Sequence, residues 1–226
     1  MPRRLPVYLV IDTSGSMSGE PIESVKDCLQ NLILDLRNHP QALETAWISV
    51  ITFDSDARQI VPLTDLLSFQ IPSIGAGGMT ALGPALSLLC ERREQECKKS
   101  WKDAEGRTHK ADWRPLVFLM TDGKPNVGDL DSGIAKFKSE RWGAAICCAA
   151  GKDADEDILK RITDEESVVK IADLSAGSLT AFFNWVTGTI LDIVEKTVQG
   201  GEPSGQRNLS DMPAMPEQVV PTVAVV

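Results

Sequence analysis

The stretch LPVYLVIDTSGSM, residues 5–17, decides the fold. Residues 5–11 form a short apolar run, which is typical of a strand in a parallel sheet. A polar loop with Asp12, Ser14 and Ser16 follows. A helix is predicted from about residue 20 to residue 38, because apolar side chains recur there every three or four positions. A strand, a polar loop and a helix in this order are the beginning of a parallel α/β sheet.

The same alternation continues along most of the 226 residues. Apolar runs predict six strands, at residues 5–11, 46–53, 57–61, 115–121, 144–149 and 168–171. The Asp-Ser-Asp turn at 54–56 makes the second and third strands an antiparallel hairpin and the third an edge strand. We therefore predict an α/β fold of the Rossmann-like kind: a doubly wound, mostly parallel six-stranded sheet with one short antiparallel edge strand and helices on both faces.

Two segments stand outside this pattern. Residues 98–114 are dense in charged side chains and are interpreted as a solvated connection, with a basic docking surface for a partner as the alternative. Residues 200–226 contain four prolines and end in an apolar, β-branched run. We predict one domain over 1–199 and a flexible tail over 200–226. That tail could also fold back on the domain or add a strand to a partner's sheet.

Composition excludes several classes of protein. Against 23 Lys and Arg stand 32 Asp and Glu, a net charge of −9 that disfavours nucleic acid and anionic membrane as partners. No apolar run approaches the roughly 20 residues of a membrane span. The five cysteines are an odd number without a Cys-x-x-Cys pair, so neither a disulfide framework nor a zinc ribbon is indicated. The expected location is the cytoplasm.

Oxygen-bearing side chains gather in three of the loops that connect the predicted strands and helices. The loop after the first strand carries Asp12, Ser14 and Ser16, the loop before the second long helix carries Thr80, and Asp122 follows the fourth strand. Loops at the carboxyl ends of parallel strands meet at one edge of the sheet. Two carboxylates and three hydroxyls without His or Cys are ligands for a hard divalent cation such as Mg²⁺ or Mn²⁺.

At these residues the sequence resembles the von Willebrand factor A domains, whose metal-ion-dependent adhesion site has an Asp-x-Ser-x-Ser loop, a separate Thr and a separate Asp. The matching positions are Asp12, Ser14, Ser16, Thr80 and Asp122. The resemblance implies that Ser14 and Ser16 bind the metal directly, that Thr80 binds it directly or through water, and that the aspartates act largely through water. It also implies that a carboxylate from a partner protein fills the remaining position.

A narrower resemblance links residues 9–17 and 77–82 to the bacterial TerY-type proteins of tellurium-resistance operons. It implies an intracellular interaction module in a stress response, with a PP2C-type phosphatase and a protein kinase as partners. The expected function is metal-dependent protein binding without catalysis.

Other interpretations of these loops use the same residues differently. Ser14 and Ser16 could simply cap the first helix, with Asp122 making a turn. A serine hydrolase is excluded because Met17 stands where its Gly-x-Ser-x-Gly motif needs serine. A magnesium-dependent phosphatase or phosphotransferase using Asp12 is the remaining alternative, although Ser14 stands where a second Asp would act as acid and base.

Overall fold

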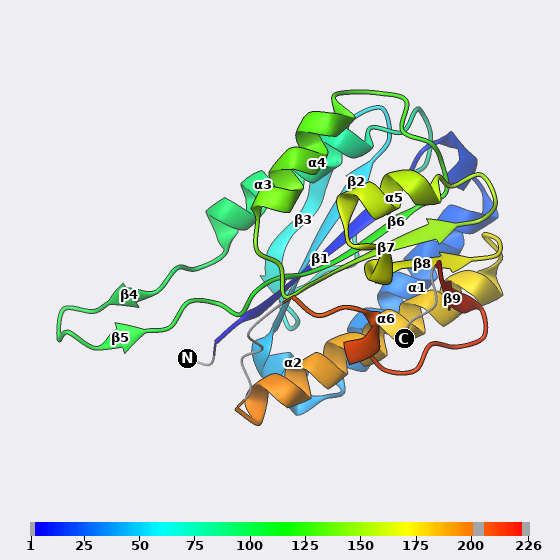
Figure 1. Ribbon diagram of the computed structural model, residues 1–226. Coiled ribbons are helices and arrows are strands. Elements are labelled where there is room, and N and C mark those ends of the chain that lie inside the picture. Colours follow the sequence, from blue (N-terminus) through cyan, green and yellow to red (C-terminus); the bar gives the residue numbers. More distant parts are fainter. Residues whose placement is uncertain (1–2, 201–205, 223–226) are drawn as a thin grey trace.

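The computed structural model describes residues 3–200 and 206–222, and within these residues seven strands form one sheet. The strands are β1 Leu5–Asp12, β2 Ala46–Phe53, β3 Ala57–Asp65, β6 Leu116–Thr121, β7 Ala144–Ala150, β8 Val168–Ile171 and β9 Val219–Pro221. Their order across the sheet is β3-β2-β1-β6-β7-β8-β9 (Figure 1).

The pairing of the strands confirms the predicted doubly wound sheet. β1 pairs parallel with β2 on one side and with β6 on the other, and β6, β7 and β8 continue in parallel. β3 pairs antiparallel with β2 and forms one edge, as the turn at 54–56 predicts. Because the chain winds away from β1 in both directions, the switch point of the sheet lies between β1 and β6.

Helices cover both faces of the sheet (Figure 1). On one side lie α1 Glu20–Arg37, the short α2 Pro40–Thr45 and α6 Ala176–Val198, and on the other lie α3 Leu82–Glu96, α4 Leu130–Ser139 and α5 Glu156–Ile162. The alternation of side chains in β1 divides the core accordingly. Val7 and Leu9 belong to the same apolar cluster as α1 and α6, whereas Tyr8 and Val10 belong to the cluster with α3, α4 and α5. Burial on both faces explains why β1 is apolar nearly throughout.

Residues 98–114 form an arm that projects from the body of the domain (Figure 1). Two short strands, β4 Trp101–Lys102 and β5 Thr108–His109, pair antiparallel at its end. All four strand residues are exposed. The segment is thus solvated, as expected, but it has a defined hairpin that its charged sequence does not predict.

The C-terminal segment differs from the expected flexible tail. Residues 219–221 form β9, which pairs antiparallel with β8 and extends the sheet by one strand. Leu209 and Val219 are buried, and the Trp185 indole nitrogen donates a hydrogen bond to Pro213 O at 3.1 Å. Residues 206–222 therefore follow the alternative in which the tail folds back on the domain, rather than lying outside it, because β9 pairs with the edge strand β8 and Pro213 contacts α6. The boundary at residue 199 stays a prediction.

No helix in the described part of the chain is both long and apolar enough to span a bilayer.

Candidate metal centre

Asp12 joins the two strands at the switch point. It is the last residue of β1 and is fully buried. Its Oδ1 accepts a hydrogen bond from the Ser14 backbone N–H at 2.8 Å, and its Oδ2 accepts one from the hydroxyl of Thr121, the last residue of β6. Both oxygens of this buried carboxylate are engaged. The geometry therefore does not favour Asp12 as a nucleophile in phosphoryl transfer.

Ser14 and Ser16 lie in the loop after β1, beside a short 3₁₀ turn at Gly15–Met17. Ser14 is buried, Ser16 is exposed, and their hydroxyl oxygens are 3.2 Å apart. The residue that precedes α1 is Gly19, and the Ser14 side chain makes no capping hydrogen bond. The interpretation of these serines as caps of the first helix is therefore wrong, which leaves their hydroxyls available at the sheet edge.

Backbone hydrogen bonds join the loop after β1 to the end of β2 and to the loop before α3. Thr13 N donates to Phe53 O at 2.8 Å, Gly77 N donates to Thr13 O at 2.9 Å, and Gly15 N donates to Gly78 O at 3.1 Å. Gly78 has a φ of +81°, and a Cβ at this position would lie 2.5 Å from Ser55 Oγ. Only glycine fits this close approach without strain. Gly78 thus lets the backbone just before Thr80 pass close to Ser55.

Thr80 is buried and is held in place by the loop after β6. Its N–H donates to Asn126 Oδ1 at 2.8 Å, and Asn126 N donates back to Thr80 O at 3.2 Å. A Cβ added to Gly123 would lie 3.4 Å from Thr80 Oγ1, so the hydroxyl faces the backbone that follows Asp122. Thr80 and Asp122 therefore belong to adjoining loops, as the sequence predicts.

Asp122 follows β6 directly and is only 5% exposed. Its Oδ1 is buried and has no hydrogen-bond partner among residues 3–200 and 206–222. Burial raises the pKa of the Asp122 carboxyl above its ordinary value and outweighs the opposing hydrogen bond from the Ser16 hydroxyl. A buried acceptor without a donor is costly, so a partner from outside the polypeptide would stabilise this oxygen.

The two carboxylates share an electrostatic problem that a cation would solve. Burial is the main cause that raises the pKa of Asp12, and the charge of Asp122 adds to it. A divalent cation offsets both desolvation and mutual repulsion, and Asp12, Ser14, Ser16, Thr80 and Asp122 supply the oxygen donors that such an ion prefers. The residues present therefore fit a hard divalent cation.

The donor chemistry of this site depends on hydroxyls. In residues 3–200 and 206–222, no cluster of three or more His, Cys, Asp and Glu side chains is placed to hold a metal ion. If only the neutral hydroxyl oxygens touched the cation directly, its direct ligands would leave its charge uncompensated, and it would attract a further anion.

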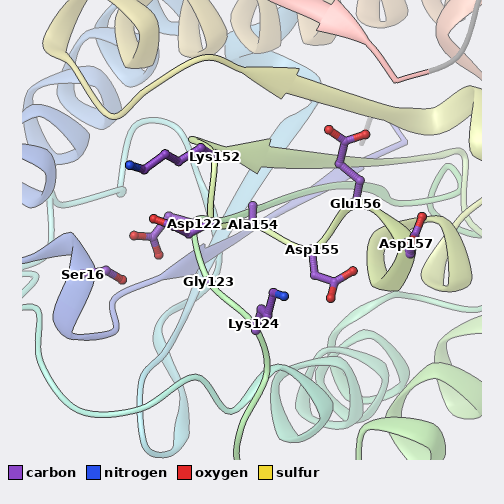
Figure 2. Close-up of a pocket in the computed structure, with 10 residues that line it drawn as sticks. Ser16, Asp122, Gly123, Lys124, Lys152, Ala154, Asp155, Glu156 and Asp157 are labelled. Atoms are coloured by element: carbon purple, nitrogen blue, oxygen red, sulfur yellow. The ribbon is translucent and has the colours of Figure 1, made fainter.

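A cleft of about 730 Å³ opens beside Asp122, between the loop after β6 and the loop after β7. Figure 2 shows Ser16 and Asp122 at one end of this cleft and Asp157 at the other. Two lysines, Lys124 and Lys152, lie on either side of Asp122 in this view. The cleft therefore adjoins the candidate metal centre at Ser16 and Asp122.

Sequence reasoning missed two supporting residues. Thr121 fixes the Asp12 carboxylate, and Asn126 fixes the Thr80 backbone. In the sequence, Thr121 is only a threonine at the end of a predicted strand, directly before Asp122. Asn126 lies in a Pro-Asn-Val-Gly loop in which an amide is ordinary turn chemistry, so no local signal distinguishes its role.

Comparison with known proteins agrees with this architecture. A family model described as von Willebrand factor type A domain matches residues 7–184. The uncharacterized protein sll0103 of Synechocystis is 32% identical over 136 residues, which cover 57% of this chain and 28% of that protein. Human inter-alpha-trypsin inhibitor heavy chain H4 is 25% identical over 169 residues, covering 69% of this chain and 17% of that protein. The chain spans less than a third of the length of these relatives.

Solved structures show the same fold. A von Willebrand factor type A protein from Catenulispora acidiphila superimposes with a TM-score of 0.63 at 19% identity, over 84% of this chain and 43% of that chain. Proximal thread matrix protein 1 from the mussel byssus, in a structure with a zinc-occupied MIDAS motif, has a TM-score of 0.58 at 20% identity, over 82% of this chain and 48% of that chain. Together with the match of the family model over residues 7–184, the doubly wound sheet shows that this chain belongs to the von Willebrand factor type A domain family.

Proposed function

We infer that this protein is a metal-dependent protein-binding module, in which Asp12, Ser14, Ser16, Thr80 and Asp122 hold Mg²⁺ or Mn²⁺. The family consists of metal-dependent adhesion and protein-interaction modules that generally act without catalysis. The observation that carries the proposal is Oδ1 of Asp122, which is buried and has no hydrogen-bond partner among the described residues. The proposed donors Asp12, Ser14 and Thr80 are buried as well.

The side chains divide the work of binding. Asp12 is held by Ser14 N–H and by the Thr121 hydroxyl, so it orients the loop that carries both serines. Asn126 holds Thr80 against the loop that carries Asp122. When bound, a divalent cation supplies an electrophilic point for an incoming Asp or Glu carboxylate. The exposed Ser16 and the adjoining cleft leave that carboxylate an open approach.

The partner and the cellular setting are part of this proposal. The resemblance of the two loops to TerY-type proteins supports a role in a bacterial tellurium-resistance or related stress response, with a PP2C-type phosphatase and a protein kinase as the candidate partners. Five cysteines that are all free support the cytoplasm as the location.

The experiment measures binding of the phosphatase and the kinase encoded nearby to the immobilised protein, with Mg²⁺ and with excess chelator. Wild type, Thr80→Ala and Ser18→Ala are compared. Ser18 is an exposed serine of the same loop outside the donor set, so Ser18→Ala is the matched control.

We expect binding in Mg²⁺ that is lost in chelator and in Thr80→Ala and retained in Ser18→Ala. Binding that persists in chelator would contradict the proposal. Hydrolysis of a generic phosphomonoester that disappears in Asp12→Asn would instead support the phosphotransferase alternative.

A further inference from the structure

A second surface lies at the opposite end of the sheet from the candidate metal centre. There the arm 98–114 leaves the end of α3 and returns to the start of β6 (Figure 1). A groove of about 480 Å³ runs between the arm and the part of the body formed by α2, β2 and the end of β3. None of the five candidate metal donors lines this groove, so its properties are independent of the proposed function.

Buried interactions hold the base of the arm in one position. Arg4 forms an ion pair with Asp112, and the side chains of both residues are at most 12% exposed. The Arg4 guanidinium also donates to Glu96 O at 2.7 Å and lies 4.6 Å from the centre of the Trp47 ring. Arg3 donates to Ala111 O at 2.7 Å. The start of β1, the end of α3 and both ends of the arm are thereby joined, which makes one wall of the groove firm.

The groove presents exposed apolar surface on both sides. On the arm, Trp101 is 54% exposed and its ring stacks on His109 with centroids 4.2 Å apart. On the body, Leu67 is 74% exposed and Leu43 and Trp47 are half-buried. Leu67 and Trp101 are the two most exposed large apolar side chains in the described part of the chain, and both line this one groove. Aromatic side chains of this kind anchor protein interfaces.

The charge on the arm differs in sign from that of the rest of the chain. Residues 98–114 contain six Lys or Arg and three Asp or Glu, a net charge of +3 within a chain of net charge −9. Lys98 and Lys110 line the groove, and among the described residues the ammonium group of neither forms an ion pair; Lys98 donates to the Asp112 carboxylate only through its backbone N–H, at 2.7 Å. The acidic side chains of the groove are Asp112, which pairs with Arg4, and Glu44 and Asp65 on the body side. Asp65 already accepts a hydrogen bond from Ser68 N at 2.9 Å.

We propose that the groove beneath the arm is a metal-independent docking site for an acidic protein segment that carries an aromatic or large aliphatic side chain. That side chain lies between Trp101 and Leu67, where it removes both from water. The acidic side chains that flank it lie along the arm, against Lys98 and Lys110. The two requirements act together, because the lysines select the sign of the charge and the apolar walls supply the anchor.

The same groove is a poor fit for nucleic acid. Glu44 and Asp65 lie on the wall opposite the lysines, and the whole chain is acidic, so a phosphate backbone meets repulsion from the body. A peptide differs because its carboxylates can all face the lysines of the arm while its single apolar side chain lies between Trp101 and Leu67.

The test uses fluorescence anisotropy of a labelled short peptide, rich in Asp and Glu, with one central Trp. Twin peptides replace the acids by Asn and Gln, or the Trp by Ser. We expect the full peptide to bind, each twin to bind about tenfold or more weakly, and added salt to weaken binding. Excess chelator should change nothing, which separates this site from the metal centre.

Two variants of the protein locate the binding. Trp101→Ser and the double variant Lys98→Glu with Lys110→Glu should each weaken binding about tenfold. Lys138→Glu, a charge reversal at an exposed lysine on α4, is the matched control and should leave affinity unchanged. The hydrogen bonds at the base of the arm use the backbone N–H of Lys98, which donates to Asp112 Oδ2 at 2.7 Å, and not the side chains of Lys98, Trp101 or Lys110. The variants should therefore keep the thermal stability of the wild type.

Several outcomes would overturn the proposal: no binding of the full peptide, equal binding of the uncharged twin, or equal loss in Lys138→Glu. Tighter binding of a single-stranded oligonucleotide than of the peptide would assign the groove to nucleic acid. Self-association in sedimentation that disappears in Trp101→Ser would assign it to a second copy of the chain.

Discussion

Gly83 and Gly133 let α3 and α4 pack at backbone contact, and replacing Gly83 tests how tightly these helices hold the candidate site. A Cβ at Gly83 would lie 2.4 Å from Asp129 O and 2.7 Å from Leu130 Cα. A Cβ at Gly133 would lie 2.4 Å from Gly83 O. The atoms in the way are backbone, so no side-chain rotation relieves the contact, and Gly83→Ala must push the two helices apart.

The size of the effect follows from two opposing contributions. Overpacking of this kind costs about 1–3 kcal/mol. Alanine gains at most about 1 kcal/mol over glycine within a helix, and Gly83 lies in the first turn of α3. The net loss of unfolding free energy should be about 1–2 kcal/mol, which lowers the Tm by about 3–6 °C in a domain of this size. Because Thr80 lies two residues before the start of α3, affinity for Mg²⁺ should also fall.

The matched control is Gly188→Ala in the middle of α6, where nothing lies within 4 Å of an added Cβ. There the helix propensity acts without a clash, so the free energy of unfolding should rise by up to about 1 kcal/mol. Urea and thermal unfolding of both variants measure the difference. A Gly83→Ala protein that is as stable as wild type, beside a stabilised Gly188→Ala protein, would refute the reasoning.

Three further predictions concern other parts of the structure. Asp112→Ala leaves the buried Arg4 guanidinium without its carboxylate, so the free energy of unfolding measured in urea should fall by about 3 kcal/mol. An unchanged free energy of unfolding would show that the ion pair does not stabilise the domain. Asn126→Ala removes the acceptor for Thr80 N–H and should weaken Mg²⁺ binding at least about tenfold in titration calorimetry; unchanged affinity would exclude a positioning role. Burial raises the pKa of the Cys90 thiol from 9.0 to about 11, so the fold favours the protonated form. The stability from that preference is fully present below pH 9 and is lost as the pH rises through about 11, and a disulfide reagent should modify Cys90 at neutral pH only in the unfolded protein.

The fold was predictable because its signals are local and repeated. Residues 46–53 and 168–171 are strands with the bounds that their apolar runs predict. The hairpin after residue 53 was predictable from its Asp-Ser-Asp turn. A strand buried on both faces needs an uninterrupted apolar run, and this requirement is visible in one sequence.

β9 was not predictable for the opposite reason. It has three residues, ends in a proline and gains its stability from pairing with β8, about fifty residues earlier in the chain. A contact of this range leaves no periodicity in the sequence. The arm at 98–114 is similar, because its position depends on Arg4 pairing with Asp112 across more than a hundred residues.

The candidate site divides in the same way. Its five proposed donors follow strands or precede helices, so the rule that such loops meet at one sheet edge was sufficient to bring them together. The residues that hold them are defined by geometry alone. Thr121 and Asn126 are ordinary polar residues until the structure shows which carboxylate and which backbone amide they bind.

The central claim is that hydroxyl oxygens of the loop after β1 take part in holding a divalent cation. Its most direct test is titration of Mn²⁺ into the protein, with free Mn²⁺ measured by electron paramagnetic resonance, for wild type, the double variant Ser14→Ala with Ser16→Ala, and Ser18→Ala. The account predicts one bound ion in wild type and in Ser18→Ala, and affinity at least about tenfold weaker in the double variant. Equal affinity in all three proteins, or no bound ion in wild type, would contradict it.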